Sequence, residues 1–113
     1  MKIEEYSQKA LSTLTSTHDY GDISSELMAQ VLGLIGESSE VAEKFKKIIR
    51  VKSGVLTDED RQEIVKELGD ILWYVNSVAT LMGSNLEEVA SKNLEKVLSR
   101  KERGQIHGSG DNR

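Results

Sequence analysis

Two long segments without proline carry apolar side chains at helical spacing, and this feature constrains the fold most. The first runs from Ser24 or Ser25 to about residue 51, and the second from Thr57 to about residue 82. Apolar residues recur three and four positions apart in both, which predicts amphipathic helices. Shorter segments with the same spacing cover about residues 3–15 and 86–101. Because proline is absent and only 4% of residues are aromatic, many-stranded sheets are disfavoured.

The ends of these segments carry helix start and stop signals. Thr57 with Asp60 three residues later is typical of a capping box, and Gly83 is expected to end that helix. Ser84 with Glu87 predicts the start of the fourth helix. A polar stretch over residues 16–24 separates the first two helices. We predict one helical domain over residues 1–101, followed by a glycine-rich tail over residues 102–113.

Two long and two shorter helices predict an all-α four-helix bundle. A chain of 113 residues buries only a modest core, and its long helices need partners on more than one side. Trp73 lies about 160° around its helix from the apolar axis, at about 100° per residue. Because tryptophan is enriched at protein interfaces, we expect the bundle to be completed by dimerisation.

Composition excludes several classes of protein. The chain has no cysteine and two histidines, which removes disulfide scaffolds, thiolate zinc sites and histidine-rich metal sites. Its net charge of −4 argues against stable nucleic-acid binding. No apolar run is long enough for a membrane span, and the acidic N-terminal sequence is unlike a signal peptide. These features predict a cytoplasmic protein without membrane association.

Two pairs of carboxylates stand beside the apolar stripes of the long helices. Glu37 and Glu40 are one turn apart on the first, and Glu67 and Asp70 on the second. On a wheel of about 100° per residue, both pairs fall on the same rotational side of their helices. If the helices pack antiparallel, the four carboxylates face one another, and such a cluster needs a compensating cation.

The chemistry of these four residues favours one kind of cation. All are oxygen donors, without sulfur or nitrogen ligands nearby, which suits Mg²⁺ or Mn²⁺. The chemistry implied is metal-assisted attack of water on a phosphoanhydride. The alternative is that each acidic pair lies on a solvated helix face.

The segments GLIGESSEVAEKFKK and KELGDILWYVNSVA carry a resemblance. They resemble the MazG nucleoside triphosphate pyrophosphohydrolases, whose signature is ExxE, a spacer and ExxD. Here Glu37 and Glu40 fill the first part, 26 residues intervene, and Glu67 and Asp70 fill the second. The resemblance implies that all four are metal ligands and catalytic residues for cleavage between the α and β phosphates. Many relatives have a glutamate where this chain has Gly36, and Glu43 is a candidate substitute.

Positive charge for a triphosphate is available on two helices. Lys44 and Lys47 share the flank of the first acidic pair, although a surface pair of Lys44 with Glu40 is an alternative. In the fourth segment, Lys92, Lys96 and Arg100 form one basic stripe beside Asn93, and the resemblance implies phosphate contacts by such residues.

Two further features of the long helices bear on the site. Tyr74, one turn past Asp70, is predicted either to contact substrate or to fill the groove. Gly33, Gly36 and Gly69 weaken the helices, and we hypothesise that they permit close helix approach.

The sequence therefore predicts a Mg²⁺-dependent, or Mn²⁺-dependent, nucleotide pyrophosphohydrolase acting as a homodimer or homotetramer. By resemblance, its role is removal of non-standard or excess (deoxy)nucleotides. Within the same superfamily, a dUTPase-like enzyme is the alternative; phosphoribosyl-ATP pyrophosphohydrolase fits less well because of Gly36. From a different class, the rival is a non-catalytic helical interaction module whose acids only solvate the bundle.

Overall fold

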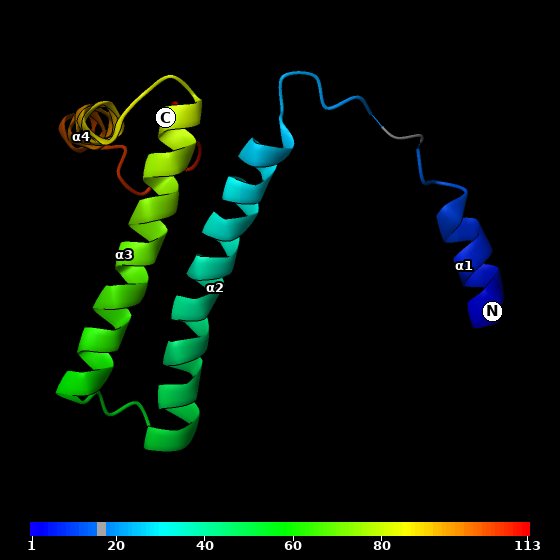
Figure 1. Cartoon of the computed structure of the whole chain (residues 1–113), viewed down its shortest axis with the longest axis horizontal. Coiled ribbons are helices and arrows are strands. Elements are labelled where there is room, and N and C mark those ends of the chain that lie inside the picture. The colour runs from blue at the N-terminus through cyan, green and yellow to red at the C-terminus, as the bar shows by residue number, and fades with distance from the viewer. Residues whose placement is uncertain (16–17) are drawn as a thin grey trace.

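The computed structural model describes residues 1–15 and 18–113, and every regular element in these ranges is helical (Figure 1). Residues 16–17, which begin the predicted polar stretch, lie outside the described residues. The helices are α1 (Ile3–Leu11), α2 (Ser25–Lys52), α3 (Asp58–Leu81) and α4 (Leu86–Arg103). The predicted all-α class is thus confirmed. Among the described residues, no helix is both long and apolar enough to cross a membrane.

Helix α1 is shorter than its apolar pattern predicts, because it ends at Leu11 rather than near Thr15. The hydroxyl groups of the next two residues explain this. Ser12 Oγ donates to the carbonyl of Lys9 at 2.6 Å, and Thr13 Oγ1 donates to that of Ala10 at 2.7 Å. Such local bonds offer the backbone an alternative to continued helix.

Helices α2 and α3 form an antiparallel hairpin whose ends are set by capping (Figure 1). Ser24 caps α2 by accepting from the Leu27 amide at 3.0 Å. At the other end, Ser53 and Gly54 adopt left-handed conformations that stop the helix. Thr57 and Asp60 then form the predicted capping box, with both hydrogen bonds at 3.1 Å.

The start of α4 differs by one residue from the prediction. Ser84 is not the cap, because its amide donates to the Ala79 carbonyl at 2.8 Å and so belongs to the turn that ends α3. Together with the Gly83 amide bond to Thr80, this is a Schellman motif, with Gly83 at a φ of 74°. Asn85 caps α4 instead, accepting from the Glu88 amide at 2.8 Å.

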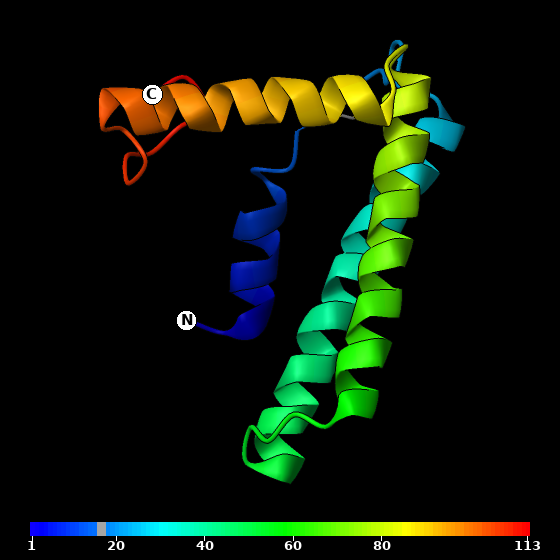
Figure 2. The same cartoon turned by 90° about the vertical axis from the view of Figure 1, so that its left-hand side faces the viewer.

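The chain by itself encloses very little core. Among the residues that the structure describes, four apolar ones are buried: Leu27, Ile48, Ile64 and Ala79. They lie along the hairpin, whereas α4 projects away from the end of α3 and α1 stands apart (Figure 2). The radius of gyration is 20.1 Å, against about 13 Å for a compact domain of this length. Over residues 1–15 and 18–113, the four helices therefore do not close into a bundle within one chain.

Candidate metal centre

Three of the four predicted carboxylates meet across the hairpin. Glu37 on α2 and Glu67 and Asp70 on α3 each place one oxygen within 4.8 Å of the others. The antiparallel pairing of α2 and α3 brings them together, because all three lie on the same rotational side of the apolar stripe of their helix. Oxygen ligands of a Mg²⁺ ion, at about 2.1 Å from the metal, lie up to about 4.2 Å apart. Small side-chain adjustments would therefore bring this group around such a cation.

Glu40 does not join that group. Its side chain is exposed one turn further along α2 and is not part of the group. Its charge nevertheless reaches the cluster, since it is among the causes that raise the pKa of Glu37. Glu43, the candidate substitute for the missing second glutamate, is also exposed and lies 4.0 Å from Lys46. Of the predicted acidic set, the structure assembles three and leaves Glu40 at the edge.

The pKa of Glu37 is raised above its ordinary value. Loss of solvation is the largest cause, followed by the negative charges of Asp70 and Glu67, a hydrogen bond with Glu67, and the charge of Glu40. The protein alone therefore disfavours full ionisation of this cluster. A bound cation would reverse that effect, because it stabilises ionised carboxylates.

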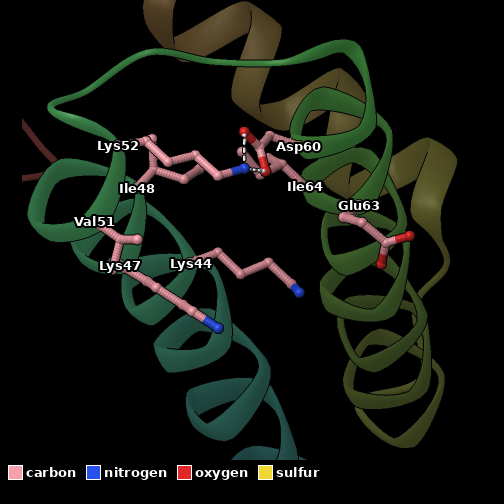
Figure 3. Close-up of a pocket in the computed structure, with 8 residues that line it drawn as sticks. All are labelled: Lys44, Lys47, Ile48, Val51, Lys52, Asp60, Glu63 and Ile64. Carbon is pink, nitrogen blue, oxygen red and sulfur yellow. Dashed lines mark hydrogen bonds and ion pairs between the residues drawn. The ribbon is translucent and has the colours of Figure 1, made fainter.

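Lys44 is the cation nearest to the cluster. Its Nζ lies 3.7 Å from Glu67 Oε1, with both side chains partly buried. It thus reaches across to α3 instead of forming the alternative surface pair with Glu40. Lys44 and Lys47 also line a groove of about 230 Å³ toward the α2–α3 turn (Figure 3). The floor of that groove is apolar, with Ile48 and Ile64 buried beneath it.

On the opposite side of the carboxylates, an aromatic pair forms a second hollow. Glu37, Asp70, Trp73 and Tyr74 line a space of about 330 Å³. The Tyr74 ring packs edge-on to Trp73, with centroids 5.0 Å apart. It also rests directly on Gly33 of α2, where any β-carbon would collide with the ring. The hypothesis of glycine-permitted approach therefore holds at Gly33, whereas Gly36 and Gly69 have no such neighbour among the described residues.

Comparison with known proteins identifies the family. Residues 24–104 match the family described as the MazG nucleotide pyrophosphohydrolase domain. The chain belongs to this family. Gene 37 protein of Mycobacterium phage L5 is 51% identical over 82 residues, which are 73% of this chain and 72% of that protein. No solved structure matches significantly. The whole α2–α3 hairpin lies inside the MazG match, whereas α1 and residues 105–113 lie outside it.

The basic stripe of the MazG domain is not brought to these carboxylates. Lys92 is exposed and pairs with Glu88 at 3.2 Å, and Asn93 is exposed. Lys96 and Arg100 instead contact the tail. Their surroundings form a separate hollow, because α4 leads away from the hairpin (Figure 2). The residues predicted to contact substrate therefore fall into two groups. Lys44, Lys47 and Tyr74 lie beside or near the cluster, whereas the α4 residues lie apart from it.

Two features of this chain, one beside the carboxylates and one in the tail after the MazG match, do not follow from the sequence pattern. The sequence predicts an interface role for Trp73, yet in the structure this side chain lines the hollow beside the carboxylates. Its position three residues after Asp70 was the available signal, since residues at that spacing share a helix face. The second feature is Asp111, whose contact with Lys96 joins residues 15 positions apart. A short polar tail carries no periodic pattern from which such a contact could be inferred.

Proposed function

We propose that this chain hydrolyses (deoxy)nucleoside triphosphates between the α and β phosphates, releasing a nucleoside monophosphate and pyrophosphate. The observation that carries this proposal is the convergence of Glu37, Glu67 and Asp70, within a MazG domain, beside Lys44. The three carboxylates are hard oxygen donors and fit Mg²⁺, with Mn²⁺ as an alternative. Glu40 completes the set from one turn further along α2.

A cation held by these carboxylates would polarise the phosphoanhydride and would lower the pKa of water beside it. The protein's own groups do the rest. Lys44 and Lys47 attract the phosphates from the α2 flank, and Tyr74 bounds the hollow in which the rest of the nucleotide lies. A carboxylate of the cluster accepts the proton of the attacking water, as a general base. The α4 residues Lys92, Asn93, Lys96 and Arg100 add phosphate contacts.

We further propose that a second copy completes this site. Within one chain the α4 stripe lies apart from the carboxylates, and the hairpin exposes large apolar side chains on both helices. A homodimer or homotetramer would cover those side chains and bring α4 of one copy toward the carboxylates of another. In this arrangement the predicted domain of residues 1–101 extends to the end of α4 at Arg103, and residues 104–113 are the appended tail.

The test is pyrophosphate release from a panel of canonical and modified NTPs and dNTPs in the presence of Mg²⁺. Glu67→Gln removes one carboxylate charge from the cluster, and we expect turnover to fall by about 100-fold or more. Glu43→Gln is the matched control, because Glu43 is an exposed acid on α2 outside the cluster. Glu43→Gln should retain activity.

Other outcomes would replace the proposal. Selective turnover of dUTP would identify the dUTPase-like member of the superfamily. Release of single phosphate would contradict cleavage between the α and β phosphates. If no nucleotide is hydrolysed and Mg²⁺ leaves the melting temperature unchanged, the interaction-module hypothesis replaces the enzyme.

A further inference from the structure

The last ten residues, Gly104–Arg113, form a folded tail that returns along α4 (Figure 2). Arg113 closes this loop on itself. Its guanidinium donates to three backbone carbonyls, those of Gln105 at 2.9 Å, Ile106 at 2.9 Å and Gly110 at 2.7 Å. The tail is thus held by its own hydrogen bonds. Because the MazG match ends at residue 104, the tail is an addition to the shared domain.

The tail docks on the basic side of α4. Arg100 is only 7% exposed, and its Nη2 donates to the Asp111 carbonyl at 2.6 Å and the Gly110 carbonyl at 3.4 Å. Arg103 Nη2 donates to the Arg113 carbonyl at 2.6 Å. Two arginines of α4 therefore hold oxygen atoms of the tail. These planar, always-charged groups would otherwise suit phosphate oxygens.

The carboxylate of Asp111 lies on the same stripe. It accepts from Lys96 Nζ at 3.2 Å and lies 3.6 Å from Arg100 Nη2. The hydrogen bond from Lys96 is the largest cause that lowers the pKa of Asp111, so this carboxylate is ionised at neutral pH. The Asp111 side chain is 84% exposed and is thus open to exchange with solvent anions. Around it lies a hollow of about 410 Å³ whose cations are Lys92, Lys96, Arg103 and Arg113.

We infer that the tail is an internal competitor for oligophosphate. Asp111 and the tail carbonyls occupy the cations that the α4 stripe would offer to phosphate, and a bound oligophosphate displaces Asp111. The tail thereby weakens phosphate binding at this stripe. This inference rests on the proposed function only for the identity of the natural oligophosphate. If the tail instead positioned Lys96 and Arg100 for the ligand, the tail would strengthen phosphate binding at this stripe.

The experiment measures binding of inorganic tripolyphosphate to the full chain by calorimetry, with EDTA present and ionic strength held at about 0.1 M. Asp111→Asn keeps the shape of the side chain and removes its charge. Because exposed ion pairs are weak, we expect tripolyphosphate to bind about two- to fivefold more tightly. Glu102→Gln, an exposed charge change on the same helix, is the matched control and should leave the Kd near that of the wild type.

A double-variant cycle locates the effect. Lys96→Gln should weaken tripolyphosphate binding. Adding Asp111→Asn to it should give a smaller gain than in the wild type, since only the longer contact with Arg100, at 3.6 Å, then remains to Asp111. An Asp111→Asn variant that binds tripolyphosphate no better than wild type overturns the inference. An equal gain from Glu102→Gln also overturns it, because general charge would then be the cause.

Nucleotide turnover separates this inference from the proposed function. If nucleotides are hydrolysed, Asp111→Asn should lower KM with kcat unchanged. If tripolyphosphate binds more tightly to Asp111→Asn while no nucleotide is hydrolysed, the competition stands and the pyrophosphohydrolase proposal fails. If nucleotides are hydrolysed but Asp111→Asn changes neither the Kd nor the KM, the competition is wrong and the proposed function stands.

Discussion

At the scale of single residues, one missing side chain shapes the hollow beside the carboxylates. Gly33 leaves room on α2 for the Tyr74 ring of α3, and that ring packs edge-on to Trp73. A glycine inside a helix lowers its stability by about 1 kcal/mol relative to alanine. The close approach of the ring is the structural reason for tolerating this loss.

Gly33→Ala therefore has two opposing effects on stability: alanine favours the helix, but its β-carbon collides with the Tyr74 ring. Overpacking by one carbon costs about 1–3 kcal/mol, which exceeds the gain of about 1 kcal/mol from helix propensity. We expect a net destabilisation and a displaced Tyr74, measured by urea unfolding. In a Tyr74→Ala background the ring is absent, so Gly33→Ala should stabilise. Equal effects in both backgrounds would contradict the contact.

The raised pKa of Glu37 predicts how cation binding depends on pH. Its raised pKa means that the folded protein holds this proton more tightly than the unfolded chain does. Without metal, this contribution to stability is present at low pH and is lost as the pH rises through the folded pKa of Glu37. Mg²⁺ binds the ionised form, so its affinity should rise across the same interval, with protons released.

Calorimetry at pH 5 and pH 7.5 would measure this linkage. We expect weaker Mg²⁺ binding at pH 5, and more protons released there than at pH 7.5. Glu37→Gln should weaken Mg²⁺ binding at both values and reduce the difference between them. An unchanged pH dependence in Glu37→Gln would assign the titration to another carboxylate.

At the scale of the elements, the junction between α3 and α4 is a Schellman turn followed directly by a cap. The Ser84 amide serves the end of α3, which leaves Asn85 to begin α4. Asn85→Ala should destabilise the protein by about 1 kcal/mol, as other cap substitutions do. Ser84→Ala keeps the backbone amide and should change stability much less. Urea unfolding of both variants decides which residue is the cap.

A second local interaction, at Asp60, stabilises the turn between α2 and α3. Asp60 has its pKa lowered to about 2, first by the hydrogen bond from Lys52 and then by that from the Thr57 amide. Because the folded pKa is depressed, this stabilisation is present above pH 4 and is lost as the pH falls toward 2. Melting temperatures of wild type and Asp60→Asn should differ most near neutral pH and converge near pH 2. A constant difference would mean that charge is not the cause.

At the scale of the whole molecule, the open shape calls for a partner. Trp73 is 60% exposed, and Leu68 and Leu72 on the same helix are also about half exposed. Helix α1, amphipathic by sequence, packs against no other helix among the described residues. Such surfaces are more extensive than monomeric proteins usually leave in water.

We therefore expect at least two copies by light scattering coupled to gel filtration at micromolar concentration. Dilution should shift the mass downward and move the Trp73 emission toward that of exposed indole. Leu72→Lys should favour smaller species, because a charge would enter the apolar surface. A monomer at every concentration, with unchanged emission, would contradict assembly.

Much of the candidate site was predictable from local pattern. Spacing placed Glu37 beside the core stripe of α2, and Glu67 and Asp70 beside that of α3, because a helix fixes the direction of each side chain. The caps at Thr57 and Gly83 followed from residue type. The end of α1 was less predictable, since it depended on hydroxyl bonds from Ser12 and Thr13 rather than on apolar spacing.

The sequence by itself determined four helices, the flank that each acidic pair occupies, and the oxygen chemistry of the candidate metal centre, since these depend on local backbone geometry and residue type. Only the tertiary structure decided that Glu40 stays at the edge, that Lys44 reaches Glu67, and that Gly33 receives the Tyr74 ring. It also decided that the Asp111 carboxylate accepts a hydrogen bond from Lys96. Such contacts depend on the rotation and approach of separate segments, which spacing within one helix does not encode.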